Sequence, residues 1–180
     1  MKKSLLIMAA ALLVSFGSCA QTQTKKAPAK ANKDVVVKML PTGLVTEDIM
    51  STIVSEFPGK VVVVDYWATW CGPCMAAMKK IDPIKEQYAK AKKPVVFVYI
   101  TGETSPLDKW EAAIPAIKGY HYRLTSQEYS GLMKSLGIRG IPTYAIYGKD
   151  GKLVYDNIAT GGYPGDDVIT SQIESALNKK

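Results

Sequence analysis

The sequence is poor in cysteine and histidine, and this scarcity excludes two kinds of small-domain scaffold. Three cysteines and one histidine occur among 180 residues. Cys19 lies in an N-terminal segment outside the expected folded domain, which leaves Cys71 and Cys74 as that domain's pair. With no further thiol, a framework of structural disulfides cannot form. Structural zinc usually takes four Cys or His ligands, so two cysteines and His121 are too few, and we expect no metal.

Excess positive charge is also scarce once the first 33 residues are set aside. The chain has 23 basic and 16 acidic residues and a formal net charge of +7. Six of the lysines and none of the acidic residues precede Asp34, so 17 basic residues accompany 16 acidic ones from there on. The folded part is therefore near neutral, and the composition does not indicate a nucleic-acid partner.

The sequence has no hydrophobic run long enough to span a bilayer. Lys2 and Lys3 precede an apolar core from Leu5 to Phe16, which is too short for a spanning helix and is typical of a secretory signal. We therefore expect residues 1–20 to be a signal peptide. The protein is then expected to work outside the cytoplasm, in the periplasm.

Two processing routes fit this signal. Small residues at Ser18 and Ala20 suit a signal peptidase, which would leave a soluble product. The run Phe16-Gly17-Ser18-Cys19 also resembles a lipobox, in which Cys19 would be acylated and would anchor the protein to lipid, although Phe16 departs from the usual leucine. A third reading is that Cys19 is an incidental residue of a discarded peptide.

Residues 21–33 (QTQTKKAPAKANK) are polar and basic, which predicts a disordered tether.

The most informative segment is an apolar run that ends at two closely spaced cysteines. The stretch 61–66 (VVVVDY) predicts a strand buried on both faces, as in a parallel sheet under helices. Gly72 and Pro73 are typical of a turn that starts a helix, so we expect Cys71 at a helix N-terminus, where its thiol pKa is lowered. Cys74 follows one turn later, near enough to attack a mixed disulfide at Cys71. The segment predicts a redox site.

This segment resembles the active site of the thioredoxin superfamily. The run Trp70-Cys71-Gly72-Pro73-Cys74 behind a buried strand that carries Asp65 is far more specific than a bare pair of cysteines. The run 140–143 (GIPT) precedes an apolar segment at the place where such proteins hold a cis-proline, here Pro142, facing the cysteines. The resemblance covers residues 34–180. It implies a thioredoxin-like α/β domain whose central mixed sheet carries helices on both faces.

Apolar periodicity predicts the elements of this domain. Strands are expected at 34–40, 60–66, 94–101, 143–147 and 152–156, and helices at 46–57, 73–92, 107–117, 126–136 and 165–177. The segment 120–124 is expected to be a short extended piece. Residues 105–125 are an addition relative to a plain thioredoxin. They resemble the insertion that the TlpA/ResA-like branch carries before the cis-proline loop.

The resemblance implies roles for individual residues. Cys71 is expected to be the attacking thiolate and Cys74 the resolving thiol, and together they would form the redox disulfide. Asp65 is implied as the buried acid that exchanges a proton with Cys74, and burial should raise its pKa. The alternative is a strand-end aspartate bonded to backbone. Substrate contacts are expected at Trp70, Gly72, Pro73, Ile141 and Pro142. Structural roles are expected for Trp67, Trp110 and His121.

The expected activity is an extracytoplasmic thiol–disulfide oxidoreductase that reduces disulfides of protein substrates through Cys71 and Cys74. Gly72 and Pro73 separate the cysteines where a histidine would favour oxidation, so we predict a reductase. The sequence has no nicotinamide or flavin motif, so we expect no cofactor and a membrane electron donor of the thiol-reducing type. The expected form is a monomer. The TlpA/ResA-like resemblance suggests cytochrome c biogenesis or general periplasmic reduction as the setting. A disulfide oxidase or isomerase and a non-catalytic thioredoxin-fold binding module are the alternatives.

Overall fold

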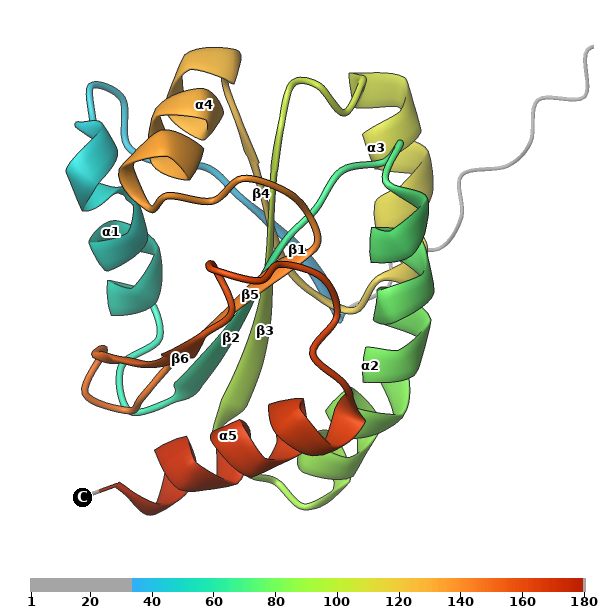
Figure 1. Ribbon diagram of the computed structural model, residues 1–180, viewed down its shortest axis with the longest axis vertical. Helices are drawn as coiled ribbons and strands as arrows, with labels where there is room; N and C mark the ends of the chain where they lie inside the picture. Colours follow the sequence, from blue (N-terminus) through green and yellow to red (C-terminus); the bar gives the residue numbers. More distant parts are fainter. Residues whose placement is uncertain (1–33, 180) are drawn as a thin grey trace, which may run out of the picture.

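The computed structural model describes residues 34–179 and arranges six strands in one mixed sheet (Figure 1). The signal peptide, Cys19 and the tether lie outside the described residues. The strand order is β1–β4–β3–β2–β5–β6. The first four strands in this order run parallel, and β5 and β6 are antiparallel to their neighbours. The strands are β1 (Val35–Lys38), β2 (Val61–Tyr66), β3 (Val95–Gly102), β4 (Gly119–Leu124), β5 (Thr143–Tyr147) and β6 (Leu153–Asp156).

Helices cover both faces of this sheet. In Figure 1, α1 and α4 lie on one side of the strands, while α2, α3 and α5 lie on the other. Two short 3-10 helices, η1 (Thr46–Asp48) and η2 (Ile114–Ala116), extend α1 and α3. The helices are α1 (Ile49–Ser55), α2 (Gly72–Lys90), α3 (Leu107–Ala113), α4 (Ser126–Ser135) and α5 (Asp166–Asn178). The predicted thioredoxin-like α/β architecture is confirmed.

Strand β2 lies between the two hydrophobic cores and contributes side chains to both. Val61 and Val63 pack on the side of α2 and α5, whereas Val62 and Val64 pack on the side of α1. Every residue of the strand is buried. This accounts for the almost unbroken apolar run in the sequence, because a parallel strand under two helical layers has no solvated face.

The insertion is more ordered than the sequence suggested. The extended piece expected at 120–124 is a full strand, β4, that lies between β1 and β3 and pairs parallel with both. The helix expected over 107–117 ends at Ala113 as an α-helix and continues as η2. Pro115 explains the change, because it has no backbone N–H to donate to the α-helical ladder.

The helix predicted over 46–57 is also divided. Thr46 opens the 3-10 helix η1, and the α-helix begins only at Ile49. The residue before η1 is Val45, and no side chain caps either segment. The Thr46 side chain packs against α4: a Cβ placed on Gly131 of that helix would lie 2.8 Å from Thr46 Oγ1.

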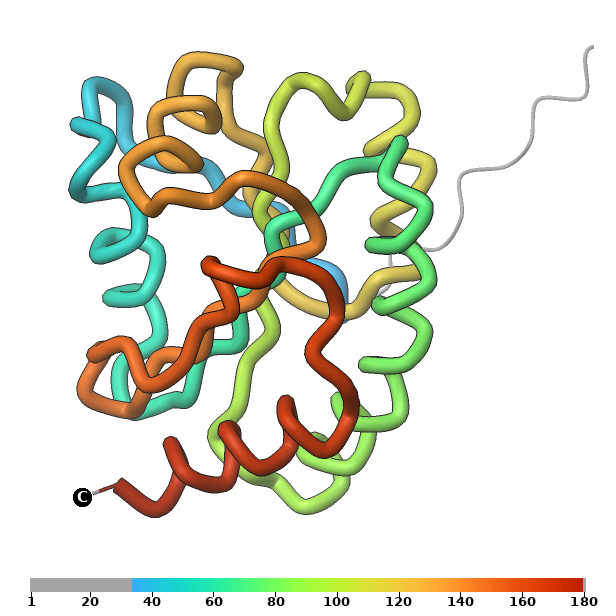
Figure 2. The backbone as a smooth tube through the Cα atoms, viewed as in Figure 1, coloured from blue at the N-terminus to red at the C-terminus, as the bar shows by residue number. Residues whose placement is uncertain are grey.

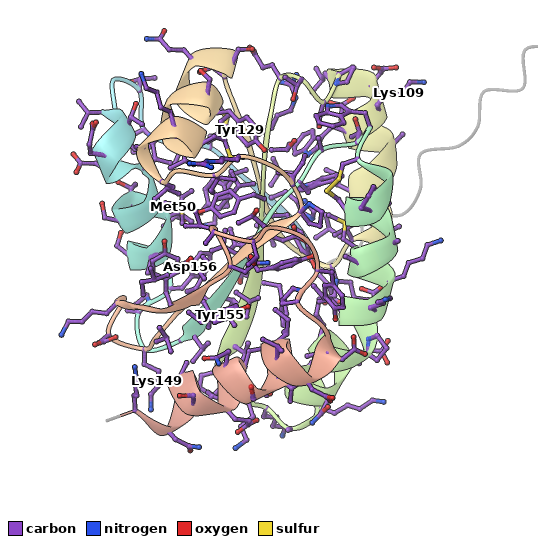
Figure 3. All side chains as sticks on the ribbon, in the orientation of Figure 1. Met50, Lys109, Tyr129, Lys149, Tyr155 and Asp156 are labelled. Carbon is purple, nitrogen blue, oxygen red and sulfur yellow. A yellow bond between two sulfur atoms is a disulfide. The ribbon has the colours of Figure 1, made fainter. Side chains whose placement is uncertain are left out.

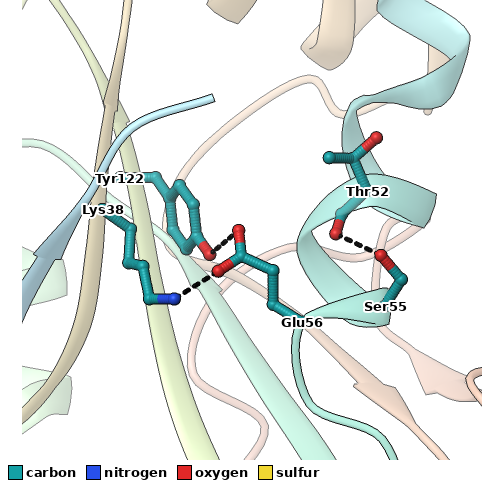
Figure 4. Close-up of polar contacts among 5 residues, drawn as sticks. All are labelled: Lys38, Thr52, Ser55, Glu56 and Tyr122. Atoms are coloured by element: carbon teal, nitrogen blue, oxygen red, sulfur yellow. Dashed lines mark hydrogen bonds and ion pairs between the residues drawn. The ribbon is translucent and has the colours of Figure 1, made fainter. Parts of the chain in front are cut away.

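Glu56, just after α1, ties that helix to two strands (Figure 4). Its Oε1 accepts a 2.9 Å hydrogen bond from the Tyr122 hydroxyl of β4. Its Oε2 forms an ion pair with Lys38 at the end of β1. These contacts fix the inserted strand and the first strand to the α1 layer. Within the described residues, no helix is long and apolar enough to cross a membrane.

Candidate redox site

The two cysteines lie where β2 leads into α2. Cys71 is the N-cap residue of α2, and Gly72 and Pro73 begin the helix. The Cys74 N–H donates to Cys71 Sγ over 3.1 Å. An N–H that points at the sulfur, together with the helix dipole, favours a thiolate at Cys71 when the pair is reduced.

The cysteines are joined by a disulfide (Figure 3). Their Cα atoms are 5.3 Å apart. Cys71 retains 4% exposure, whereas Cys74 is fully buried. An external thiol or disulfide can therefore reach Cys71 more readily than Cys74. This asymmetry fits an outer attacking sulfur and an inner resolving sulfur.

The loop before β5 lies beside Cys71. The connection from α4 to β5 passes across the end of the sheet (Figure 2), and the Ile141 carbonyl oxygen lies 3.8 Å from Cys71 Sγ. The Ile141–Pro142 peptide bond is cis, as the sequence predicted. Pro142 is buried and Ile141 is partly exposed. The backbone of this loop thus lies beside the Cys71 sulfur.

Asn157, which follows β6, braces the proline loop, and sequence reasoning missed it. Its side-chain oxygen accepts the Tyr144 N–H at 2.7 Å. Its amide nitrogen donates to the carbonyls of Gly161 at 3.2 Å and Gly162 at 2.7 Å. The Gly162 N–H in turn donates to the Pro142 carbonyl at 2.8 Å. A buried asparagine in an otherwise polar turn gave no pattern that could have identified it.

The insertion supports the other side of the site through Ser105. Its hydroxyl accepts the Thr69 N–H at 2.9 Å and lies 2.8 Å from the Thr101 hydroxyl of β3. Arg123 of β4 donates to the Ser105 carbonyl at 3.1 Å. The turn that carries Trp70 and Cys71 is therefore held by the segment that the sequence identified as an addition.

The tryptophans beside the cysteines have opposite environments. Trp70 is 64% exposed, whereas Trp67 is fully buried in the core that includes both cysteines.

A pocket of about 470 Å³ lies beside Trp70 and is lined by Thr69, Trp70, Thr104, Pro106, Lys109 and Ala113. Lys109 of α3 is labelled in Figure 3. A second pocket, of about 300 Å³, follows the proline loop from Arg139 to Ile141 and reaches Gly162. Each pocket is thus lined by a residue next to the redox site, Trp70 in one and Ile141 in the other.

Asp65 lies in the strand that leads to the cysteines, buried on the α2 side of the sheet. It retains 2% exposure, and no described residue hydrogen-bonds either carboxyl oxygen. Burial raises the pKa of this carboxyl to about 7, while the nearby Tyr144 hydroxyl and the Lys85 charge act to lower it. The Tyr144 hydroxyl approaches the carboxyl, but its geometry falls short of a hydrogen bond. The bonded strand-end aspartate that the sequence left open is therefore not observed.

Lys85 is the second residue that sequence reasoning missed. It is buried in α2, and its ammonium group donates to the Tyr99 hydroxyl at 3.0 Å. A signal was present: Ile81, Ile84, Lys85 and Tyr88 follow the helical spacing of a core-facing stripe. A lysine on such a stripe has to bury its charge, which marks it as unusual.

The predicted site residues that lie within residues 34–179 converge. Asp65 lies in the strand behind the site. The other predicted residues meet at one end of the sheet: Cys71, Cys74, Trp70, Gly72, Pro73, Ile141 and Pro142. Cys19 lies outside the described residues. His121 of β4 is fully buried and bonds the Ile117 carbonyl at 2.7 Å. Residues 34–179 contain no group of three or more His, Cys, Asp or Glu side chains that could hold a metal ion.

A sheet of this topology, with a Cys-Gly-Pro-Cys disulfide at a helix N-terminus opposite a cis-proline, defines a thiol–disulfide oxidoreductase of the thioredoxin superfamily. The Redoxin family model matches residues 22–168, and the chain belongs to this family.

Individual relatives agree with this assignment. The thiol-disulfide oxidoreductase ResA of Bacillus cereus is 29% identical over 161 residues, which cover 86% of this chain and 88% of ResA. The probable nucleoredoxin 3 of Oryza sativa is 27% identical over 76% of this chain, which spans only 31% of that longer protein. Among solved structures, the thioredoxin domain of a thiol-disulfide oxidoreductase from Bacteroides vulgatus shares the fold. Its TM-score is 0.56 at 21% identity, covering 68% of this chain and 83% of that one.

Proposed function

We propose that this protein is an extracytoplasmic reductase of disulfides in protein substrates. The observation that carries the proposal is the asymmetric pair at the start of α2: a marginally exposed Cys71 whose sulfur receives a backbone N–H, and a fully buried Cys74 one turn later. Gly72 and Pro73 between them place no histidine beside the thiolate. Without that extra stabilisation the dithiol is a better electron donor, as in thioredoxin.

The reaction uses the two sulfurs in sequence. The Cys71 thiolate attacks one sulfur of a substrate disulfide, the substrate S–S bond breaks, and the released substrate sulfur takes up a proton. Cys74 then loses its proton to Asp65 and attacks Cys71 Sγ. The second substrate sulfur leaves as a thiolate and is protonated. The Cys71–Cys74 disulfide forms, and two electrons have passed from the protein dithiol to the substrate.

Surface features around Cys71 support binding of an extended substrate segment. Trp70 offers an exposed aromatic face, with Gly72 and Pro73 beside it at the open start of α2. The backbone at Ile141 and Pro142 borders the sulfur on the other side. We assign these residues to substrate contact.

The N-terminal sequence supports export and anchoring, and the lack of a nicotinamide or flavin motif supports recharging by another protein. In this proposal the N-terminal signal exports the chain, acylated Cys19 is retained as the lipid anchor, and residues 21–33 tether a monomeric domain to the membrane surface. A membrane electron donor of the thiol-reducing type returns the Cys71–Cys74 disulfide to the dithiol. The similarity to the thiol-disulfide oxidoreductase ResA over most of both chains supports the redox activity in this proposal.

Insulin reduction with dithiothreitol as electron source tests the proposal. The unmodified protein should accelerate precipitation of the insulin B chain, and Cys71→Ser should abolish the acceleration. Cys74→Ser should accumulate a covalent mixed disulfide through Cys71. A non-catalytic binding module would leave insulin reduction unchanged in all three proteins.

A further inference from the structure

A row of polar side chains crosses the core beneath the redox site. Tyr144, Asp65, Tyr99 and His121 occupy directly paired positions on β5, β2, β3 and β4. Side chains paired in register point to the same face of a sheet, and this face is the one that α2 covers. All four residues are at most 2% exposed. The row is a continuous polar line through an otherwise apolar core.

Lys85 enters this row from α2. Its ammonium group lies 3.0 Å from the Tyr99 hydroxyl, 3.1 Å from the Lys118 carbonyl oxygen and 2.7 Å from Asp82 Oδ1. These partners use all three hydrogens of the ammonium group. The Lys85 side chain is only 7% exposed. The positive charge is therefore fixed in place at the inner side of the helix.

The two carboxyl groups near Lys85, those of Asp82 and Asp65, differ in solvent exposure. The Asp82 side chain is 47% exposed, so water screens its attraction for Lys85. Asp65 is buried, and charges that interact through the protein interior are screened much less. Burial raises the pKa of Asp65, while the Tyr144 hydroxyl and then the Lys85 charge lower it. Burial lowers the pKa of Lys85, while Asp82 and, to a smaller extent, Asp65 raise it. Each group thus favours the charged form of the other.

The remaining titratable groups around Asp65 supply no comparable buried cation. Burial raises the pKa of the neighbouring tyrosines, so these are neutral near pH 7. Burial also lowers the pKa of His121 to about 4, so the imidazole is neutral too. Lys118 has an exposed side chain. The titratable groups that surround this part of the core are Tyr144, Tyr163, Tyr99, His121, Tyr129, Asp82, Lys85, Lys118, Cys71 and Cys74.

We propose that Lys85 is a positioning residue of the redox reaction: the ammonium charge that Tyr99 and Asp82 hold in the core sets the pH range over which Asp65 accepts the proton of Cys74. This inference rests on the proposed role of Asp65 in the reductase. It adds that the proton affinity of the buried acid is set from α2, through a residue that touches neither substrate nor sulfur. Near neutral pH, Lys85 keeps a larger share of Asp65 ionised and able to accept a proton.

The direct test is a carboxyl ¹³C NMR titration of Asp65 in the full chain with the disulfide formed. Lys85→Met matches the length of the side chain but removes the charge, and it should raise the Asp65 midpoint by about one pH unit, a tenfold change in proton affinity. Lys85→Arg keeps the charge and should hold the midpoint near its original value. Lys79→Met removes an exposed charge from the same helix and should not move the midpoint. An unmoved midpoint in Lys85→Met, or an equal shift in Lys79→Met, overturns the proposal.

The pH profile of insulin reduction separates this role from a structural one. Starting from a pKa of about 7, a rise of about one unit leaves roughly a fifth as much ionised Asp65 at pH 7. Lys85→Met should therefore be about fivefold slower at pH 7 and equal to the unmodified protein above pH ~9. A loss of the same size at every pH contradicts the proposal. If Lys85→Met does not fold, Lys85→Gln keeps a donor for the Lys118 carbonyl and carries the same measurements.

The outcomes also distinguish failure of this proposal from failure of the proposed function. If insulin reduction does not require Cys71, the reductase assignment fails whatever the Asp65 midpoint does. If Cys71 is required but the midpoint does not respond to Lys85, the reductase stands and the role of Lys85 is refuted. If the midpoint responds but Asp65→Asn leaves the kinetics unchanged, Asp65 does not handle the proton, and the proposal falls with it.

Discussion

The backbone N–H of Tyr144 donates its hydrogen bond to the side chain of Asn157, and not to a neighbouring strand, over 2.7 Å. Asn157 is 7% exposed and also bonds two carbonyl oxygens in the loop that follows β6. Asn157→Ala leaves these buried groups without partners, so we expect it to lower the free energy of unfolding by about 2–3 kcal/mol. Denaturant unfolding followed by circular dichroism measures this loss.

The same variant should affect activity beyond its effect on stability. Gly162, which Asn157 positions, donates to the Pro142 carbonyl beside the cysteines. We expect insulin reduction by Asn157→Ala to slow at temperatures where the variant is still fully folded. Asn178→Ala, in which an exposed asparagine at the end of α5 is lost, serves as the control. Equal activity in the two variants would mean that the brace is not needed for catalysis.

Asp65→Asn should stabilise the protein in a pH-dependent way. The carboxyl has a pKa of about 7 in the folded state against an ordinary value of 3.8, so the unfolded chain releases its proton first as pH rises. The native aspartate therefore costs stability above pH ~4, and the cost grows until pH passes about 7. We expect Asp65→Asn to be more stable by about 2–4 kcal/mol at pH 8 and close to unchanged at pH 3.

The activity of Asp65→Asn should change in the opposite direction. An amide cannot accept the Cys74 proton, so release of the mixed disulfide should slow near neutral pH. Stopped-flow measurement of that step, beside urea unfolding at pH 3 and pH 8, examines both expectations. A variant that is less stable at pH 8 and kinetically normal would indicate a purely structural aspartate.

Replacement by alanine should affect stability and activity differently at Trp70 and at Trp67. Trp70 is largely exposed, so Trp70→Ala is expected to leave stability within about 0.5 kcal/mol and to raise KM for a protein substrate. Trp67 is fully buried beside the cysteines, so Trp67→Ala is expected to cost about 3–5 kcal/mol of stability. Thermal unfolding and steady-state kinetics on both variants provide the comparison. Unchanged KM in Trp70→Ala would remove this side chain from substrate contact.

Local sequence patterns were sufficient to predict the part of the site that is local in the chain. The run 61–66 reads as a doubly buried strand, and Cys71 to Cys74 reads as a helix start, because neighbouring residues determine both. The cis-proline followed from its position before β5 and from the resemblance.

Other features depend on contacts between distant segments. Lys85 is bonded to Tyr99 and Lys118, and Asn157 bonds the N–H of a residue 13 positions earlier. The segment 120–124 contains two tyrosines, a histidine and an arginine, so its composition did not predict a strand enclosed between β1 and β3. Its burial depends on the insertion as a whole, so a short stretch of sequence does not predict it.

The central claim is the reducing direction, and the reduction potential of the Cys71–Cys74 pair tests it most directly. The full chain is equilibrated with glutathione buffers, free thiols are alkylated, and the oxidised fraction is read from the mass shift. With Gly72 and Pro73 between the cysteines, we predict a potential below about −230 mV, on the thioredoxin side of the scale. A value near −120 mV, about that of a strong disulfide-forming oxidant, would contradict the account.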